Sequence, residues 1–171
     1  MKGNLLVAGI GNIFLGDDAF GVEVANRLAQ RSQPTGVRVV DYGIRSYDLA
    51  YALMEEWDLV ILVDALPRGG DPGTLYVLEP QLPEGDEVRP SVDAHTMNPV
   101  AVLQLVSALG GKVGRMLVVG CEPAGIEPDE QGNMGLSEPV SAAVEEAVRM
   151  VEELITRARS EATAYATGAA K

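Results

Sequence analysis

Cysteine and histidine are almost missing from this sequence of 171 residues, which has one of each, Cys121 and His95. A lone cysteine excludes an intrachain disulfide and a zinc site made of cysteines alone, and a lone histidine excludes every motif that needs two. Basic residues are also few: 13 Lys and Arg stand against 25 Asp and Glu, so the formal net charge is −12. A surface this acidic disfavours non-specific binding to nucleic acid or to anionic lipid. We therefore expect no nucleic acid and no membrane among the partners of this protein.

Long apolar runs and a signal segment are absent as well. No apolar run approaches the roughly 18 residues that a membrane-spanning helix needs, and no basic-then-apolar stretch opens the chain. We therefore expect a soluble, cytoplasmic protein. Aromatic residues make up 5% of the chain and hydrophobic residues 47%, so Val, Leu, Ala and Met must form most of a sizeable core.

Short apolar runs alternate with amphipathic stretches along the chain, which is the pattern of repeated β–α units. The run LVILVD at 59–64 is apolar until its last residue, so both faces of that strand should be covered. The pattern predicts one α/β domain over residues 1–158. It would be a three-layer sandwich, with a mostly parallel, twisted, five-stranded sheet and helices on both faces. Residues 159–171 are small and polar and are expected to form a disordered tail. The predicted strands are 5–10, 37–42, 59–64, 74–78 and 116–119, and the predicted helices end near residues 31, 57, 109 and 157.

Three metal-binding side chains follow the ends of predicted strands. Asp18 comes after the first strand, Asp64 ends the third, and His95 precedes a helix. In open α/β sheets, ligands bind at the carboxyl ends of the strands, so these residues should share one edge. Two carboxylates and one imidazole form a partial shell for Ni²⁺ or Zn²⁺. Each residue also has an ordinary structural explanation, such as a helix cap for Asp17 or Asp18. Their coincidence at one edge favours the metal site.

A dinucleotide site is a weaker alternative. Gly9, Gly11 and Asp41 superficially resemble its fingerprint, but Phe14 stands where close helix–strand packing requires a third glycine. The neighbouring carboxylates would also repel a pyrophosphate.

A receiver-like phosphoacceptor domain is the second alternative. Asp17, Asp18 and Asp64 could hold Mg²⁺ and accept a phosphoryl group. Such a site also needs a lysine at the end of the last strand, and Gly120, Cys121 and Glu122 stand there instead.

The opening motif GIGNIFLGDD at 9–18 resembles the signature of the hydrogenase maturation endopeptidases. This motif is fairly specific because it combines a glycine loop, an asparagine and paired acids. The likeness covers roughly residues 4–157 and continues through 41–43, 62–65, 72–74, His95, 119–120 and 127–128.

The resemblance implies an endopeptidase, of the aspartic type or metal-assisted, that removes the C-terminal peptide of the nickel-loaded large-subunit precursor of a [NiFe]-hydrogenase. It implies that Asp18, Asp64 and His95 contact nickel and take part in catalysis, with the nickel supplied by the substrate. Other divalent metals, such as zinc or cadmium, could occupy the same site. A non-catalytic, nickel-dependent docking protein remains an open alternative. The residues predicted to bind substrate are Gly9, Gly11, Asn12, Asp41 and Gly43.

Overall fold

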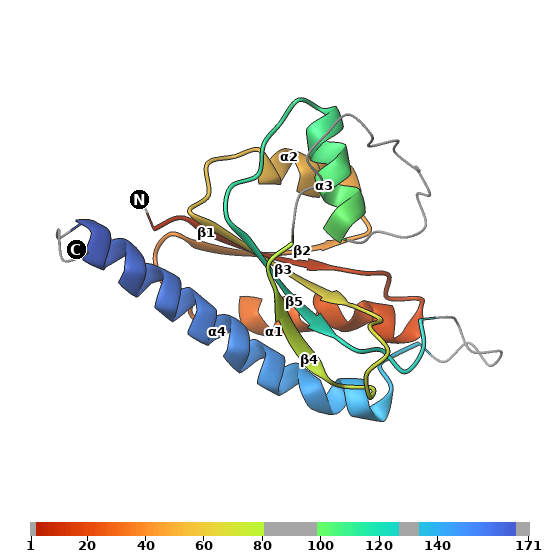
Figure 1. Cartoon of the computed structure of the whole chain (residues 1–171). Helices are drawn as coiled ribbons and strands as arrows, with labels where there is room; N and C mark the ends of the chain where they lie inside the picture. The colour runs from red at the N-terminus through yellow and green to blue at the C-terminus, as the bar shows by residue number, and fades with distance from the viewer. Residues whose placement is uncertain (1–2, 81–98, 127–133, 167–171) are drawn as a thin grey trace.

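The computed structural model describes residues 3–80, 99–126 and 134–166. These residues form a five-stranded sheet flanked by helices (Figure 1). In chain order the elements are β1 (Leu5–Ile10), the 3₁₀ helix η1 (Gly16–Ala19), α1 (Phe20–Ala29), β2 (Val37–Gly43), α2 (Ser46–Leu53), β3 (Leu59–Ala65), β4 (Leu75–Leu78), α3 (Pro99–Ala108), β5 (Met116–Cys121) and α4 (Glu138–Ala166).

The strands are arranged in the order β2-β1-β3-β5-β4. β1 pairs in parallel with β2 and β3, and β3 pairs in parallel with β5. β4 alone among them is antiparallel, pairing with β5. The predicted mostly parallel sheet is therefore confirmed, and the carboxyl ends of β1, β2, β3 and β5 lie at one edge.

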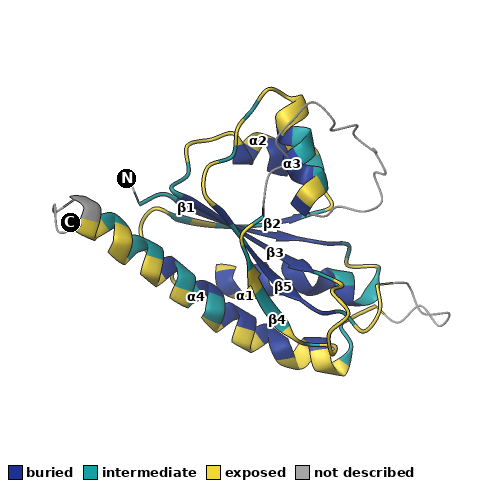
Figure 2. Ribbon diagram, in the orientation of Figure 1, coloured by how far each residue is buried: buried dark blue, intermediate teal, exposed yellow. Residues whose placement is uncertain are grey.

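Helices cover both faces of the sheet, as the uniform apolarity of the third strand predicts. Alternate residues of β1 point to opposite sides: Leu5 and Val7 join a core with α1 and α4, while Leu6 and Ala8 join a second core with α2 and α3. Figure 1 places α1 and α4 on one side of the sheet and α2 and α3 on the other. Every residue of β1 and β3 is buried (Figure 2).

Helix α1 lies unusually close to the sheet because two glycines face each other at the contact. A Cβ atom on Gly21 would run into the carbonyl oxygens of Val63 and Ile10, and one on Gly9 would meet the carbonyl oxygen of Gly21. The close approach brings η1, which immediately precedes α1, against the end of β3. The acidic pair of the opening motif is therefore held at the sheet edge.

Two helix ends differ from the prediction. Helix α2 ends at Leu53 rather than near Trp57, whose indole N–H instead donates to the carbonyl oxygen of Ala52 at 2.7 Å. Helix α4 does not end near residue 157 but continues to Ala166, through residues predicted to be a disordered tail.

The extension of α4 is explained both by contacts with distant parts of the chain and by residues of α4 itself. Arg115 forms an ion pair with Glu161 at 2.9 Å, and Arg159 donates to the carbonyl oxygen of Thr35 at 2.6 Å. Arg157 and Glu161, one turn apart, pair at 3.3 Å. Alanine and arginine are also strong helix formers. Together with the surface contacts, they extend α4 through residues whose polar composition predicts a tail. No helix within the described ranges is both long and apolar enough to cross a membrane.

Candidate active site

Asp18 and Asp64 come together at the carboxyl edge of the sheet. Asp18 lies in η1, after β1, and its Oδ2 accepts the backbone N–H of Asn12 at 2.7 Å. Asp64 is the penultimate residue of β3 and is only 1% exposed. Its Oδ1 is buried and finds no hydrogen-bond partner among the described residues. A buried carboxylate oxygen without a hydrogen-bond partner destabilises the folded state. A cation bound at this position would remove that destabilisation.

The surroundings raise the pKa of both carboxyls. Burial raises the pKa of Asp64 well above its usual value, and the negative charge of Asp18 raises it further, against a smaller opposite effect of the hydrogen bond from the Ala65 backbone. Burial also raises the pKa of Asp18, while the hydrogen bond from Asn12 lowers it. Two carboxylates that resist ionisation side by side are stabilised when a positive ion binds between them.

Asp17 has a different role from its neighbour. It is 2% exposed, and its Oδ2 accepts the backbone N–H groups of Ala124, at 2.7 Å, and Gly125, at 3.2 Å. Ser137 donates to it twice, from its backbone N–H to Oδ1 at 2.7 Å and from its hydroxyl to Oδ2 at 2.9 Å. Neither η1 nor α1 has a side-chain cap, so the interpretation of Asp17 or Asp18 as a helix N-cap is wrong. Through these hydrogen bonds, Asp17 connects η1 to the segment after β5 and to the start of α4.

Four of the five predicted substrate-binding residues line one open groove of about 280 Å³, and one of them, Asn12, is hydrogen-bonded to Asp18. They come from the ends of two neighbouring strands, and the backbone N–H of Gly11 donates to the carbonyl oxygen of Gly43 at 3.0 Å, joining the two loops. The four are Gly11, Asn12, Asp41 and Gly43.

The three glycines among the predicted substrate-binding residues have different structural roles. Gly11 has a φ of +137°, and a Cβ there would collide with the carbonyl oxygen of Asp18. Gly43 has a φ of +54° at the end of β2. Gly9, in contrast, is buried in β1 under α1 and does not line the groove. Its missing side chain permits the close packing of the helix, and contact with substrate stays a prediction for all five residues.

His95 falls in 81–98, outside the described residues, so its position relative to Asp18 and Asp64 stays a prediction. Within the described ranges, no group of three or more His, Cys, Asp and Glu residues is arranged to hold a metal ion. The described part of the chain thus contains two of the three residues predicted to bind metal, and metal binding by all three stays a prediction.

Sequence reasoning missed the structural role of Glu122, the residue after β5. Its carboxylate is 4% exposed and accepts the backbone N–H groups of Arg68 and Gly69 and the hydroxyl of Tyr76. Burial opposes ionisation, but these hydrogen bonds together lower the pKa of Glu122. The glycine-rich turn at 69–73 is the signal in the sequence, since exposed backbone N–H groups attract a carboxylate.

Cys121 is not a nucleophile in this site. Its side chain is fully buried, and burial, followed by the charges of Asp17 and Glu122, raises the pKa of the thiol to about 12. A thiol with this pKa remains protonated at neutral pH, as expected from its acidic neighbours in the sequence.

This chain is similar to known proteins along most of its length. The family model of hydrogenase maturation protease (HycI) matches residues 22–154. Coenzyme F420 hydrogenase subunit delta of Methanothermobacter thermautotrophicus is 32% identical over 153 residues, which cover 86% of this chain and 91% of that protein. The hydrogenase 2 maturation protease of Escherichia coli is 29% identical over 153 residues, covering 86% and 87%.

A solved structure has the same fold. The hydrogenase maturating endopeptidase HybD of Escherichia coli superposes with a TM-score of 0.69 at 30% sequence identity, covering 90% of this chain and 93% of the other. The family model spans well over half of the chain and the likeness extends through the sheet and its flanking helices. This chain therefore belongs to the hydrogenase maturation protease family.

Proposed function

We propose that this protein is an endopeptidase that removes the C-terminal peptide of the nickel-loaded large-subunit precursor of a [NiFe]-hydrogenase. The observation that carries the proposal is the buried Oδ1 of Asp64, which has no partner among the described residues and lies near the charge of Asp18. Family membership supplies the reaction class, and the paired carboxylates supply a place where a cation carried by the substrate would be recognised.

Asp18, Asp64 and His95 would complete the coordination of the nickel that the precursor carries. When bound, a divalent metal can polarise a carbonyl group or lower the pKa of a bound water molecule. The backbone N–H of Asn12 holds Oδ2 of Asp18 at 2.7 Å and so orients that carboxylate. Burial raises the pKa of Asp64, and a carboxylate that does not bind the metal could accept a proton from the attacking water as a general base.

Weak intrinsic metal binding would make the reaction depend on the state of the substrate. Two carboxylates and one histidine are few ligands for a tight nickel site. An empty precursor would therefore leave the site without its cation and would not be positioned for cleavage. This dependence would reserve processing for precursors that already hold nickel.

The groove lined by Gly11, Asn12, Asp41 and Gly43 lies where the substrate backbone would approach. Gly11 and Gly43 have no side chains to obstruct an extended peptide. We propose that these residues, and Gly9 behind them, form the substrate-binding side of the site, with Asp41 as its charged member.

The test is cleavage of the precursor, prepared with and without nickel, followed by intact mass. We expect loss of a C-terminal peptide only from the nickel-loaded form, and at least a 100-fold lower rate for His95→Ala and Asp64→Asn. Glu153→Gln, at an exposed carboxylate of α4, is the matched control and should cleave normally. An unchanged mass of a verified loaded precursor would refute the proposal. If that precursor nevertheless formed a nickel-dependent complex, the protein would be a docking protein instead.

A further inference from the structure

Large apolar side chains are exposed in the groove and on helix α2, which follows it in the chain. Phe14 is 62% exposed, Ile44 61% and Tyr51 60%, and Ile13 and Tyr47 are exposed as well. We call these five residues the apolar rim. Most large apolar side chains in the described residues are buried, so a cluster of this kind at one place is a candidate contact surface.

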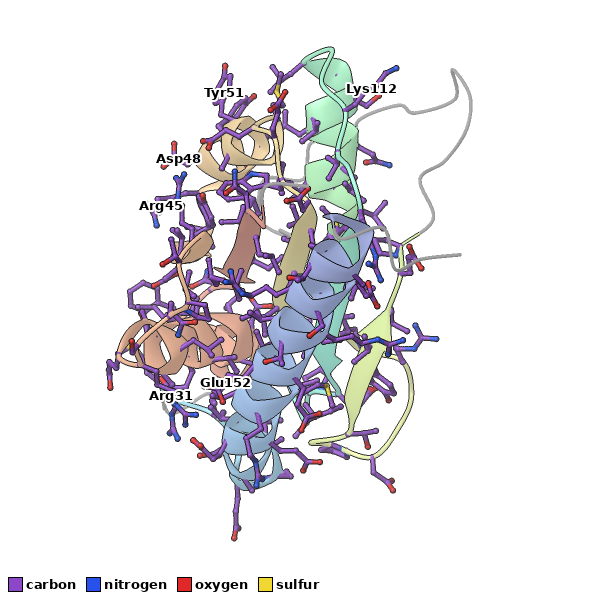
Figure 3. The ribbon with its side chains drawn as sticks, turned by 90° about the vertical axis from the view of Figure 1, so that its left-hand side faces the viewer. Arg31, Arg45, Asp48, Tyr51, Lys112 and Glu152 are labelled. Carbon is purple, nitrogen blue, oxygen red and sulfur yellow. The ribbon has the colours of Figure 1, made fainter. Side chains whose placement is uncertain are left out.

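The members of the apolar rim lie on adjoining segments. Ile13 and Phe14 belong to the loop after β1, and Ile44 follows β2, the neighbouring strand. Tyr47 and Tyr51 are four residues apart in α2 and therefore share one face of that helix. Figure 3 shows Tyr51 on the same side of the molecule as Arg45 and Asp48, which belong to the same segment.

The apolar rim is tied directly to the carboxylate site. Asn12 donates its backbone N–H to Asp18, and its side-chain Oδ1 accepts the backbone N–H of Phe14 at 2.9 Å. One residue thus fixes both the acid and the start of the rim. Phe14 and Asp18 are both hydrogen-bonded to Asn12, so a chain segment that covers Phe14 would lie near Asp18.

The groove is small. Its volume is about 280 Å³, at or below the lower end of the range for complete small-molecule sites. Ile13, Phe14 and Ile44 all contribute to its lining. Arg45, which also lines the groove, already has partners for its positive charge. Its guanidinium donates to the carbonyl oxygens of Tyr42 and Asp41 and forms an ion pair with Asp48 at 3.7 Å.

We propose that the apolar rim docks an extended segment of the hydrogenase large-subunit precursor that carries apolar side chains next to the scissile bond. This inference rests on the proposed function. Asn12 links the rim to the carboxylate site, and its hydrogen bond with the backbone of Phe14 is already formed without a partner. A preformed surface loses little conformational entropy on binding. Burying an exposed Phe or Ile side chain against the segment would contribute binding energy without touching the reacting atoms.

The test separates substrate binding from chemistry. Phe14→Ser and Ile44→Ser should each raise KM for the nickel-loaded precursor about tenfold, as expected for a buried side chain of this size, with kcat changed less than about threefold. Val77→Ser is the matched control, because Val77 is 43% exposed on β4, at the opposite edge of the sheet. Both rim side chains are exposed, so the melting temperatures of the variants should stay within about 2 °C of the parent.

The possible outcomes test the proposed function and the docking surface separately. If the parent protein does not cleave the loaded precursor, the proposed function fails, and the docking surface is then tested by precursor binding with and without Phe14→Ser. If the parent cleaves and the rim variants keep its KM, or lose only kcat, the docking surface is wrong. A concentration-dependent dimer that disappears in Phe14→Ser would also overturn it, because the rim would then contact a second copy of this chain.

Discussion

Replacing Asp17 with alanine should detach the start of α4 from the loop that carries Asp18. The carboxylate of Asp17 accepts four hydrogen bonds at 2.7 to 3.2 Å, three from backbone N–H groups and one from a hydroxyl. Its own backbone N–H donates to the carbonyl oxygen of Gly125 at 3.2 Å. The residues it joins, Ala124 and Ser137, are 107 and 120 positions away in the chain. Loss of this carboxylate therefore removes a long-range connection.

The size of the effect follows from how well water can replace the carboxylate. A hydrogen bond to a charged group contributes about 1.5 to 3 kcal/mol. Ala124 and Gly125 are exposed, so water can satisfy their N–H groups, and much of that energy is recovered. We expect Asp17→Ala to lower the free energy of unfolding by about 2 to 4 kcal/mol, which corresponds to roughly 5 to 15 °C in melting temperature.

Asp17→Asn should be intermediate and not neutral. The amide keeps one acceptor oxygen, but its NH₂ group must then face groups that also donate, from Ala124 and Gly125 or from Ser137. We expect a loss of about 1 to 3 kcal/mol. Ser137→Ala removes only the hydroxyl bond and should cost about 1 kcal/mol. Urea unfolding followed by circular dichroism measures all three, and a loss below about 0.5 kcal/mol for Asp17→Ala would refute the reasoning.

Three further predictions use other parts of the structure. Asp64→Asn should raise the melting temperature of the metal-free protein at pH 7. Because folding raises the pKa of Asp64, ionisation of this carboxyl destabilises the folded state as the pH rises above about 4. The increase in melting temperature should therefore vanish at more acidic pH, and an equal increase at pH 3 would contradict the prediction. Gly21→Ala should lower the free energy of unfolding by at least about 2 kcal/mol, measured in urea, because the new Cβ would collide with the carbonyl oxygens of Val63 and Ile10. The control Asn26→Ala, on the exposed face of α1, should leave the free energy of unfolding unchanged. Cys121 should resist alkylation at pH 8 until the protein is unfolded, because its pKa is about 12 and it is fully buried; rapid labelling of the folded chain would refute this.

The fold could be predicted because its determinants are local. The uniformly apolar run ending at Asp64 indicates a strand covered on both faces, and β3 is indeed at the centre of the sheet and fully buried. The alternation of strands and amphipathic stretches predicts parallel connections, and these place the carboxyl ends of β1, β2, β3 and β5 on the same edge. Asp18 and Asp64 could therefore be placed together without any knowledge of their contacts.

The long-range polar contacts could not be predicted in the same way. The sequence shows that Glu122 is acidic, but not that the backbone N–H groups 53 and 54 residues earlier turn toward it. The end of α4 is a similar case. Its last turns are polar and look like a tail, and they are held by Arg115 and Thr35 from distant parts of the chain. Periodicity describes one segment at a time and contains no information about such partners.

Asp17 and Asp18 illustrate why neighbouring identical residues need a structure to be told apart. They sit in η1, a 3₁₀ helix, in which successive side chains are about 120° apart around the axis. The two carboxylates therefore cannot point the same way. Asp17 points toward Ser137 and the segment after β5, where its hydrogen bonds are satisfied internally. Asp18 points toward Asn12 and exerts its charge on Asp64. Because the first acid holds the turn in place, the second can remain available at the sheet edge, and the pair supplies one structural carboxylate and one candidate ligand.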